Sequence, residues 1–430
     1  MNEGHPLQGK DFLCYNNAEF NPKKFSLVKE CMAVLRGKTI LVGVSGGIAA
    51  YKIPNLVSML VKQHANVHVL LSRHAAEFIP PIPFEALTGN RCLVDTFERT
   101  QPPEIHHVTL AKKADLMIIA PASADIIGKL ACGIADDMLT STVLPCRCPI
   151  LFAPAMNDRM YQNPIVQDNM AKLRQYGFIQ IDAVTGHLAC GDDGPGKMPD
   201  PEILYQYIER ELAAPKDMKG LRVLVTAGAT QEALDPVRYI TNHSSGKMGY
   251  AIAKAAMLRG AEVVLVSGRT ALKPPSFVQV EPVVSAADMF EAVTRLAPQQ
   301  DIIIKAAAVA DYTPAEVASE KMKKKDGELS IPLKRTQDIL AWLGEHRQPG
   351  QFLCGFSMET ENMLENSRKK LAKKKIDLIA ANNLKVEGAG FQGDTNVLTL
   401  ISEKEERPLP LMTKEQAAMA LLDTILEMWE

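Results

Sequence analysis

Short runs of β-branched and other apolar residues alternate along the chain with longer segments whose apolar residues recur at helical spacing. The runs of the first half are TILVGV, VHVLL, LMIIA, PILFA and FIQI, and those of the second half are RVLVTAG, EVVLVSG, DIIIKAAA, QFLCGF, DLIAANN and VLTLI. This alternation predicts parallel β-sheets with helices on both faces, because strands that are apolar throughout are buried on both sides. We therefore expect an α/β protein with two mostly parallel, doubly wound, Rossmann-like sheets.

One segment, ELAAPKDMKG, interrupts the alternation and contains Pro215 and Gly220. It predicts a linker at 212–220 between domains at 32–211 and 221–430. The first 31 residues have neither a helical nor a strand period, and they lack the apolar core of a signal peptide. We expect 1–31 to be a disordered or non-native extension, with Met32 as the natural start.

Composition and charge narrow the class of protein. Of the 430 residues, 47% are hydrophobic and 23% are charged, which is typical of a soluble globular protein, and the net charge of −2 favours neither nucleic acid nor an anionic membrane. No apolar run approaches the roughly 18 residues that span a bilayer. The eight cysteines form no CxxC pair, and the closest pair is Cys146-Arg147-Cys148. This argues against a structural zinc and a disulfide framework, and we expect a reducing cytoplasm.

The segment GVSGGIAAYK follows the first predicted strand and opens a helix. In open α/β sheets ligands bind outside the carboxyl ends of the strands, and backbone N–H groups at a helix N-terminus bind a phosphate well. Ser45 adds a hydroxyl beside Gly46 and Gly47. The spacing is not GxGxxG, and Ser72, rather than an acidic residue, closes the second strand. A mononucleotide is therefore favoured over a dinucleotide, with a plain strand–helix joint as the alternative.

Two further segments of the first half carry candidate chemistry. IIAPASAD follows the third strand, where small residues let a flat ligand approach the backbone and Ser123 can cap the next helix; capping alone would also explain this serine. TGHLACGDDGPGKMPDP, which contains Cys190, has no apolar period. Long loops without regular structure in compact domains are often lids or disordered segments, and we expect Cys190 to lie on a lid.

The second half contains RYITNHSSGKMG, which is not a Walker A motif, since Met248 follows Lys247. It predicts a helix N-terminus capped by Ser244 or Ser245. Two lysine clusters follow, EKMKKK and SRKKLAKKK. Most such clusters are solvated helix faces, but converging lysines would neutralise a triphosphate and a leaving pyrophosphate.

Five motifs in the first half, SGGIAAYK, HVTLAKKADL, APASAD, APAMN and ACGDDGPGKM, occur in the order and spacing of the FMN-dependent cysteine decarboxylases. The first half resembles the decarboxylase half of the bifunctional phosphopantothenoylcysteine decarboxylases/phosphopantothenate–cysteine ligases of bacterial coenzyme A synthesis. The resemblance implies that FMN oxidises the substrate thiol so that carbon dioxide can leave. It implies an FMN site formed by Ser45, Gly46, Gly47, Ser72, Pro121, Ala122 and Ser123.

The same resemblance implies three catalytic residues. His107, with His106 as the competing candidate, would be the base that helps to activate the substrate thiol. Asn157 would hold the carboxylate, and Cys190 would be the acid that protonates the enethiol.

The second half resembles the ligase half of the same family over nearly all of 220–430, through TAGATQEALDPVRYITNHSSGKMG, AAAVADY, EKMKKK, GF and the lysines before DLIAAN. The resemblance implies that phosphopantothenate attacks CTP to give an acyl-cytidylate and pyrophosphate, and that cysteine then displaces CMP. Asn242 would serve the intermediate, Arg238 would support that site and Lys321 would act in the first half-reaction. Mg²⁺ would be bound through the CTP phosphates, with its protein ligand left open. The implied CTP contacts are Asp311, Asp338, Phe356, Lys370 and Lys374.

Two departures from the family pattern are KRTQDIL in place of KNPDI and GFSMET in place of GFAAET. The resemblance also implies a homo-oligomer with trimeric decarboxylase and dimeric ligase contacts, together a dodecamer. A tandem NAD(P)-binding oxidoreductase is the alternative, although it leaves the absent fingerprint and the lysine clusters unexplained. A nucleotide- or RNA-binding module would explain the lysines alone, and no aromatic residues interleave with them.

Overall fold

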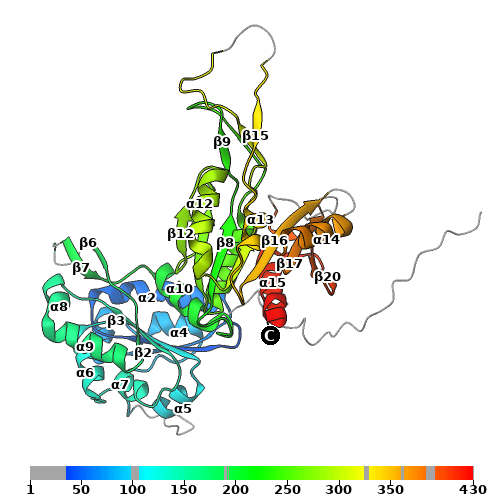
Figure 1. Ribbon diagram of the computed structural model, residues 1–430. Helices are drawn as coiled ribbons and strands as arrows, with labels where there is room; N and C mark the ends of the chain where they lie inside the picture. Colours follow the sequence, from blue (N-terminus) through cyan, green and yellow to red (C-terminus); the bar gives the residue numbers. More distant parts are fainter. Residues whose placement is uncertain are drawn as a thin grey trace, which may run out of the picture.

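The computed structural model describes residues 35–97, 106–187, 191, 193–323, 329–359, 363–383 and 393–429. The predicted α/β class is confirmed, and the described residues form two separate main sheets (Figure 1). Within these ranges no helix is long and apolar enough to cross a bilayer.

The N-terminal half is built on a five-stranded, fully parallel sheet in the order β2-β1-β3-β4-β5. Its two faces pack against separate apolar clusters, so that Ile40 and Val42 of β1 lie in one cluster and Leu41 lies in the other. The strands are β1 (Thr39–Val44), β2 (Asn66–Leu71), β3 (Leu116–Ala122), β4 (Ile150–Pro154) and β5 (Ile179–Gln180). The predicted strand FIQI is reduced to the two residues of β5.

Helices cover both faces of this sheet. They are η1 (Ile48–Lys52), α2 (Ile53–Lys62), α3 (Arg73–Phe78), α4 (Ile82–Thr88), α5 (His106–Lys113), α6 (Ala124–Cys132), α7 (Met138–Val143), α8 (Asp158–Gln162), α9 (Pro164–Gln175) and α10 (Pro201–Leu212). A separate antiparallel hairpin of β6 (Val184–His187) and β7 (Asp193–Lys197) follows β5.

The C-terminal half is built on an eight-stranded sheet in the order β12-β11-β8-β13-β16-β17-β19-β20. The first six strands in this order are parallel, and β19 and β20 join antiparallel at one edge. Only residues 402–405 separate β19 from β20, which is too short for a parallel crossover. The strands are β8 (Arg222–Ala227), β11 (Glu262–Ser267), β12 (Gln279–Pro282), β13 (Ile302–Lys305), β16 (Phe352–Glu359), β17 (Leu378–Asn383), β19 (Leu398–Ile401) and β20 (Glu406–Pro408).

The two faces of the larger sheet also have separate cores. One core contains residues of α11 (Lys247–Leu258) and α15 (Lys414–Trp429). The other contains residues of α12 (Ala286–Leu296), α13 (Ile339–Glu345) and α14 (Met363–Lys374). The short elements are η2 (Ala297–Gln299) and the paired strands β18 (Thr395–Asn396) and β21 (Met412–Thr413).

Two narrow antiparallel ribbons project from the larger sheet as an arm (Figure 1). One ribbon pairs β9 (Gln231–Ala233) with β10 (Tyr239–Thr241), and the other pairs β14 (Tyr312–Pro314) with β15 (Leu333–Arg335). β9 follows β8 and β14 follows β13 along the chain, so the arm starts at the carboxyl edge of the sheet.

Helix α10 contacts both halves. Leu204 and Ile208 are fully buried in the core of the N-terminal half. The Tyr207 ring, which also packs against that core, meets the Phe277 ring edge-on at a centroid distance of 4.7 Å, and Glu209 forms an ion pair with Lys254 at 3.0 Å. The two sheets are therefore joined by a packed helix as well as by the chain itself.

Candidate active sites

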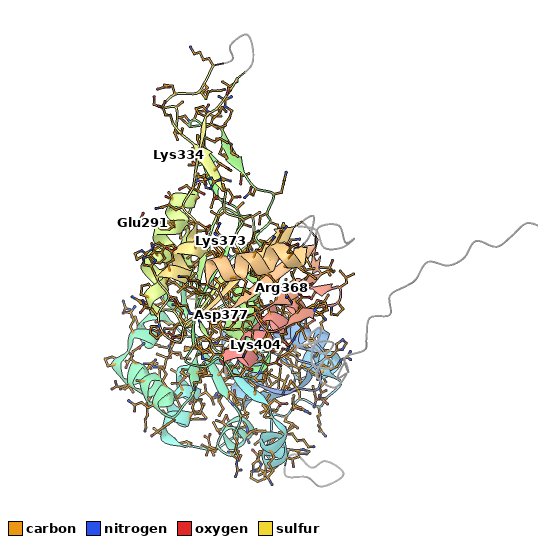
Figure 2. The ribbon with its side chains drawn as sticks, turned by 45° about the vertical axis from the view of Figure 1, so that its right-hand side comes forward. Glu291, Lys334, Arg368, Lys373, Asp377 and Lys404 are labelled. Carbon is orange, nitrogen blue, oxygen red and sulfur yellow. The ribbon has the colours of Figure 1, made fainter. Side chains whose placement is uncertain are left out.

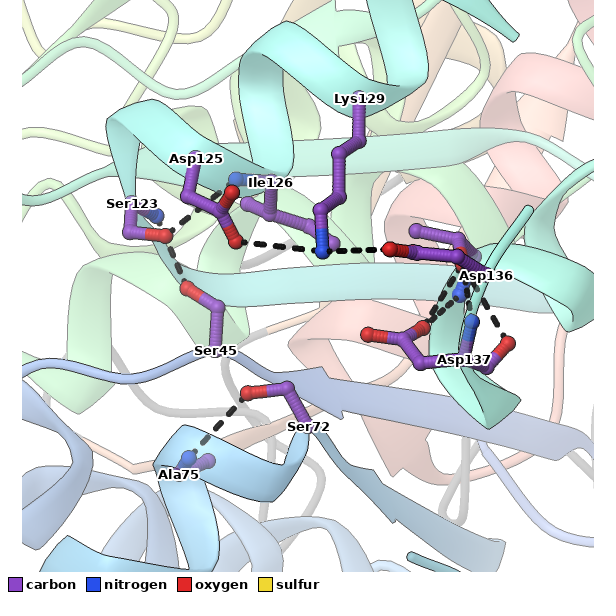
Figure 3. Close-up of polar contacts among 10 residues, drawn as sticks. Ser45, Ser72, Ala75, Ser123, Asp125, Ile126, Lys129, Asp136 and Asp137 are labelled. Atoms are coloured by element: carbon purple, nitrogen blue, oxygen red, sulfur yellow. Dashed lines mark hydrogen bonds and ion pairs between the residues drawn. The ribbon is translucent and has the colours of Figure 1, made fainter. Parts of the chain in front are cut away.

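Ser45 fastens the carboxyl ends of β1 and β3 together. Its hydroxyl donates to the Pro121 carbonyl at 2.8 Å and accepts from the Ser123 N–H at 2.8 Å, and Figure 3 shows its contact with Ser123. The residue is 2% exposed, as expected for a side chain with both partners inside the protein. Because this hydroxyl donates its proton to a carbonyl, backbone N–H groups of the glycine turn are the better donors for a ligand.

Two further serines of the predicted phosphate site cap helices. Ser72 accepts a hydrogen bond from the Ala75 N–H at 3.1 Å at the start of α3, and Ser123 accepts one from the Ile126 N–H at 3.4 Å at the start of α6. The glycine turn itself leads into η1 and α2. Three helix N-termini therefore follow the carboxyl ends of β1, β2 and β3, where their partial positive charges favour an anion.

A cavity of about 410 Å³ lies among these helix starts. Gly46 is essential to its shape, because a Cβ at this position would lie 2.5 Å from the Cβ of His74. A phosphate-bearing ligand fits this cradle, since one wall is glycine backbone and another is the start of α6. Pro121 and Ala122 lie at the end of β3 and are not among the residues that line it. The lining residues are Gly46, His74, Glu77, Phe78, Ser123, Ala124, Asp125 and Met160.

Sequence reasoning found Gly46 and Ser123 of this lining and missed His74, Phe78 and Met160. The first two of the missed residues belong to α3, directly after the second strand, so their place in the chain was a usable signal. Met160 lies in α8, which follows β4 and is far along the chain from α3. Nothing in its sequence context marks it.

Lys129 ties the start of α6 to the loop that follows that helix. Its ammonium lies 3.6 Å from Asp125 and 3.1 Å from Asp136 (Figure 3). Burial alone would lower the pKa of Lys129, but its hydrogen bond with Asp136 and the charge of Asp125 raise it above its ordinary value. Asp137 then caps α7 by accepting from the Thr140 N–H at 2.7 Å. These contacts fix the loop between α6 and α7. None of the residues that make them is among the predicted site residues.

His106 and His107 occupy the first turn of α5, and both are half-buried. In a right-handed strand–helix–strand crossover the helix runs antiparallel to its strands. The start of α5 is therefore at the carboxyl edge of the sheet, the same edge as the cavity. The structure brings neither histidine into the cavity lining.

Asn157 caps α8, with its Oδ1 accepting from the Arg159 N–H at 2.9 Å. The hairpin of β6 and β7 packs directly on this loop, because the Met156 N–H donates to the Gly196 carbonyl at 3.0 Å. A Cβ at Gly194 would lie 2.8 Å from the Cβ of Asp158, so this close approach needs a glycine. Cys190 lies between the two strands of the hairpin, outside the described residues.

In the C-terminal half, Asn242 bridges two loops at the carboxyl edge. Its side-chain amide donates to the carbonyls of Ala308 and Val309 at 3.4 and 3.2 Å. Thr230 reinforces the same junction by accepting from the Ala310 N–H at 3.0 Å. The segments that follow β8, β10 and β13 are therefore held together at one place.

Arg238 is paired with Asp235, a residue that sequence reasoning missed. The Arg238 guanidinium lies 2.6 Å from a carboxylate oxygen of Asp235, and that carboxylate also accepts from the Met322 N–H at 3.1 Å. Arg238 donates in addition to the Met322 carbonyl at 3.1 Å. The guanidinium holds the pKa of Asp235 well below its usual range. This pair positions the segment that carries Lys321, the residue before Met322.

A second charged group is centred on Lys374, at the end of α14. Lys374 forms an ion pair with Asp338, and Asp338 caps α13 by accepting from the Ala341 N–H at 3.0 Å. Burial lowers the pKa of Lys374, and the charge of Asp311 opposes this effect only in part. Asp311, Asp338 and Lys374 were predicted from their motifs, and the structure brings them together.

Lys305, the last residue of β13, belongs to the same group and was missed. Burial lowers the pKa of Lys305 to about 8; the charge of Asp311 raises it, and that of Lys374 lowers it further. A lysine with a pKa this low is typical of a functional site. The sequence signal was the lysine inside DIIIKAAA, which pattern analysis treats as part of an apolar strand.

The remaining predicted residues stand around this group. Lys370 lies one turn before Lys374 and is exposed, and Phe356 in β16 is half-buried against the apolar core. Figure 2 shows Arg368 and Lys373 on α14 and, well apart from them, Lys334 on the arm. The second lysine cluster therefore lies on α14, whereas Lys321 of the first cluster precedes Met322, whose carbonyl accepts from Arg238.

Helix α11 begins differently from the prediction. Gly246, with φ of 77°, is its N-cap, a left-handed conformation that favours glycine. Ser244 and Ser245 make shorter-range contacts, accepting from the N–H groups of Gly246 and Lys247 at 3.3 and 3.5 Å.

Comparison with known proteins gives the class first. The N-terminal half is a flavoprotein domain, since the family model described as Flavoprotein matches residues 30–213. The model of the DNA/pantothenate metabolism flavoprotein C-terminal domain matches residues 218–428.

Curated relatives then identify the family. The Coenzyme A biosynthesis bifunctional protein CoaBC of Bacillus subtilis (strain 168) is 46% identical over 398 residues, covering 91% of this chain and 97% of the relative. The protein of the same name from Escherichia coli (strain K12) is 41% identical, covering 92% and 98%. The crystal structure of a CoaBC C-terminal domain is 45% identical and covers 49% of this chain and 96% of its own, with a TM-score of 0.43. The chain belongs to the CoaBC family of bifunctional coenzyme A biosynthesis enzymes.

Proposed function

We propose that the C-terminal half joins phosphopantothenate to cysteine with CTP, and that the N-terminal half decarboxylates the product, phosphopantothenoylcysteine, to phosphopantetheine. The observation that carries the proposal is the presence of two different sites on one chain. One is a cradle of helix starts and glycine backbone suited to a single phosphate, and the other is a group of lysines and carboxylates suited to a triphosphate. The product of the ligase is the substrate of the decarboxylase.

In the N-terminal half we assign the phosphate of FMN to the glycine turn at Gly46 and Gly47, with Ser72 and Ser123 holding the neighbouring helix starts. Bound FMN would supply the oxidation that makes decarboxylation possible. Asn157 would hold the substrate carboxylate through its amide. His107 would accept the thiol proton, and Cys190 would return a proton to the enethiol.

In the C-terminal half we assign the triphosphate of CTP to the lysines of the second site. Lys374 and Lys370 on α14, together with Lys305 on β13, would place positive charge against the phosphates at the carboxyl edge. Asp311 and Asp338 would orient these lysines, and Phe356 would contact the nucleotide.

Three residues near the arm would act on the acyl group. Asn242 stands at the junction of the loops, where its amide would face the acyl-cytidylate. Arg238 would support that position, and Lys321 would act in the attack of the carboxylate on CTP. Mg²⁺ would bind through the CTP phosphates. The described residues contain no cluster of three or more His, Cys, Asp or Glu side chains that could hold a metal ion.

We further propose that the enzyme acts in the cytoplasm as a homo-oligomer with trimeric decarboxylase contacts and dimeric ligase contacts. Analytical ultracentrifugation of the full chain tests the oligomer. A monomer at micromolar concentration would contradict it.

The function is tested in one reaction that contains the purified protein, phosphopantothenate, cysteine, CTP and Mg²⁺, followed by mass spectrometry. Phosphopantetheine with CMP is the expected result. Accumulation of phosphopantothenoylcysteine would contradict the decarboxylase assignment and leave the ligase standing. Unconsumed CTP would contradict the ligase assignment, and phosphopantothenoylcysteine supplied directly would then test the flavin half alone.

A further inference from the structure

Lys247, from the segment RYITNHSSGKMG, is the first residue of α11 and has no role in the reaction proposed above. Its ammonium forms an ion pair with Asp394 at 2.7 Å. The pair joins two distant parts of the C-terminal half, because Asp394 lies just before β18, 147 residues further along the chain. The side chains of Lys247 and Asp394 are 33% and 87% exposed, so a ligand can reach both charges.

A third charged residue, Lys414, holds the backbone of this segment in place. Lys414 is the first residue of α15 and is 5% exposed. Its backbone N–H donates to the Asp394 carbonyl at 2.9 Å, and its ammonium donates to the Gly393 carbonyl. The pairing of β18 with β21 fixes the same segment, with Asn396 opposite Met412. The position of Asp394 is therefore set by its backbone, while its carboxylate stays exposed.

The ion pair is linked to the loop junction that Asn242 bridges. A Cβ at Gly246, the residue before Lys247, would lie 3.3 Å from the Gly228 nitrogen. The Gly228 carbonyl accepts from the Ala308 N–H at 2.9 Å, and the Ala308 carbonyl accepts from the Asn242 amide at 3.4 Å. The start of α11 and the proposed position of the acyl-cytidylate are therefore connected through the backbone of Gly228 and Ala308.

The charges of this pair favour a zwitterion over a phosphate. Asp394 places a negative charge beside Lys247, and that charge would repel the phosphates of CTP and of phosphopantothenate. Of the three proposed substrates, cysteine alone carries a cation and an anion on the same carbon atom. An exposed ion pair adds little to stability, so a ligand with matching charges can open it readily.

We propose that Lys247 and Asp394 bind the α-amino acid group of cysteine in the ligase reaction, an inference that rests on the ligase function proposed above. Lys247 binds the carboxylate of cysteine in exchange for its contact with Asp394. Asp394 accepts a hydrogen bond from the amino group, which attacks as the neutral amine after it has released a proton to solvent. A C–N bond forms as the bond from the acyl carbon to the oxygen of CMP breaks, and the amine gives a second proton to solvent.

The test uses the full-length, flavin-loaded protein with two nucleophiles. These are cysteine and cysteamine, which has the same thiol and amine but no carboxylate. Mass spectrometry measures the acyl-cytidylate that forms from CTP and phosphopantothenate before a nucleophile is added. Steady-state kinetics then measure KM and kcat/KM for each nucleophile.

In Lys247→Met, we expect KM for cysteine to rise about tenfold, from the loss of one charge-assisted hydrogen bond. The kinetics with cysteamine and the yield of acyl-cytidylate should stay unchanged, which also verifies that the ligase half is folded. In Asp394→Asn, we expect a few-fold rise in KM for both nucleophiles, because both contain the amine. Lys404→Met is the matched control and should change neither KM. Lys404 is exposed in the turn between β19 and β20, at the opposite edge of the sheet.

Three results would overturn the cysteine site. One is an unchanged KM for cysteine in Lys247→Met. Another is an equal loss with cysteine and cysteamine in that variant, which would show that the ion pair only fastens the segment before β18 to α11. The third is a loss of acyl-cytidylate in Lys247→Met, which would assign Lys247 to the first half-reaction. A wild type that forms no acyl-cytidylate would instead contradict the ligase function itself, and this inference with it.

Discussion

The two proposed active sites occupy the same position in their sheets and differ in how they attract phosphate. The flavin cradle offers a phosphate helix starts, a glycine turn and capping serines, although His74, Glu77 and Asp125 also line it. The ligase site relies on Lys305, Lys374 and their carboxylates, whose charges depend on one another. A single phosphate that stays bound is matched by fixed dipoles. CTP must bind, react and release pyrophosphate, and its triphosphate is matched by side-chain charges that depend on one another.

The largest difference between the two halves is expected on substitution of Cys190, to which the proposal gives a role in the decarboxylase reaction alone. We expect Cys190→Ser to retain flavin and to accumulate decarboxylated enethiol, with turnover lowered about 10²–10⁴-fold by loss of a general acid. Mass spectrometry of the products measures the block. CTP consumption by the same variant is the control and should not change. Normal turnover to phosphopantetheine would rule out this role for Cys190.

The dependence of the flavin cradle on shape is tested at Gly46. We expect Gly46→Ala to lose most of its flavin, because the new Cβ would meet His74 at 2.5 Å, an overpacking that costs about 1–3 kcal/mol. The flavin-to-protein absorbance ratio measures this. Gly128→Ala in α6 is the matched control, since a Cβ there would meet only the side chain of Asn169, at 3.8 Å, and it should keep its flavin. Equal flavin content in the two variants would show that the close approach is unimportant.

The dependence of the ligase site on charge is tested at Lys305. As pH rises through about 8, Lys305 loses its proton, and we expect kcat/KM for CTP to fall. Lys305→Met should lower kcat/KM for CTP roughly tenfold at pH 7, from the loss of a charge-assisted hydrogen bond, and should remove this pH dependence. Lys305→Arg, which stays charged, should extend activity to higher pH. An unchanged pH profile in Lys305→Met would contradict the assignment.

The same residue predicts a change of stability with the opposite sign. The folded-state pKa of Lys305 is about 8, below its ordinary value of 10.5, so between these values the unfolded chain binds more protons than the folded chain. The contribution of Lys305 to the free energy of unfolding therefore rises with pH across this window. Urea titration of the wild type and of Lys305→Met at several pH values measures the difference. A constant difference would contradict the lowered pKa.

The smallest effect is expected at Asp235. Asp235→Asn should weaken the contact with Arg238 and the hold on Met322, and we expect a few-fold rise in KM for CTP or phosphopantothenate with little change in kcat. Asp301→Asn is the matched control, because Asp301 also pairs with an arginine, Arg222, at 2.9 Å, but at the amino edge of the same sheet. Equal kinetic effects in both variants would point to general destabilisation instead of positioning.

Sequence patterns predicted the architecture well, because strands buried on both faces and helices that cover them leave a clear apolar period. They also found the residues that lie in recognisable motifs, such as Asp311 and Lys374. Lys305 and Asp235 escaped because their significance depends on distant partners: Lys374 is far along the chain from Lys305, and Met322 is far from Asp235. His74 and Met160 escaped because a cavity wall has no pattern of its own along one strand or helix.

Helix α10 has a consequence for how the molecule melts. Its inner side completes the core of the flavoprotein half, while Arg210 lies 4.3 Å from the ring centre of Phe277 and Glu209 holds Lys254 in the other half. A chain divided just after Leu212 would leave the ligase half without those partners. The two halves should therefore unfold cooperatively. Thermal unfolding of the flavoprotein half should lower the melting temperature of the ligase half.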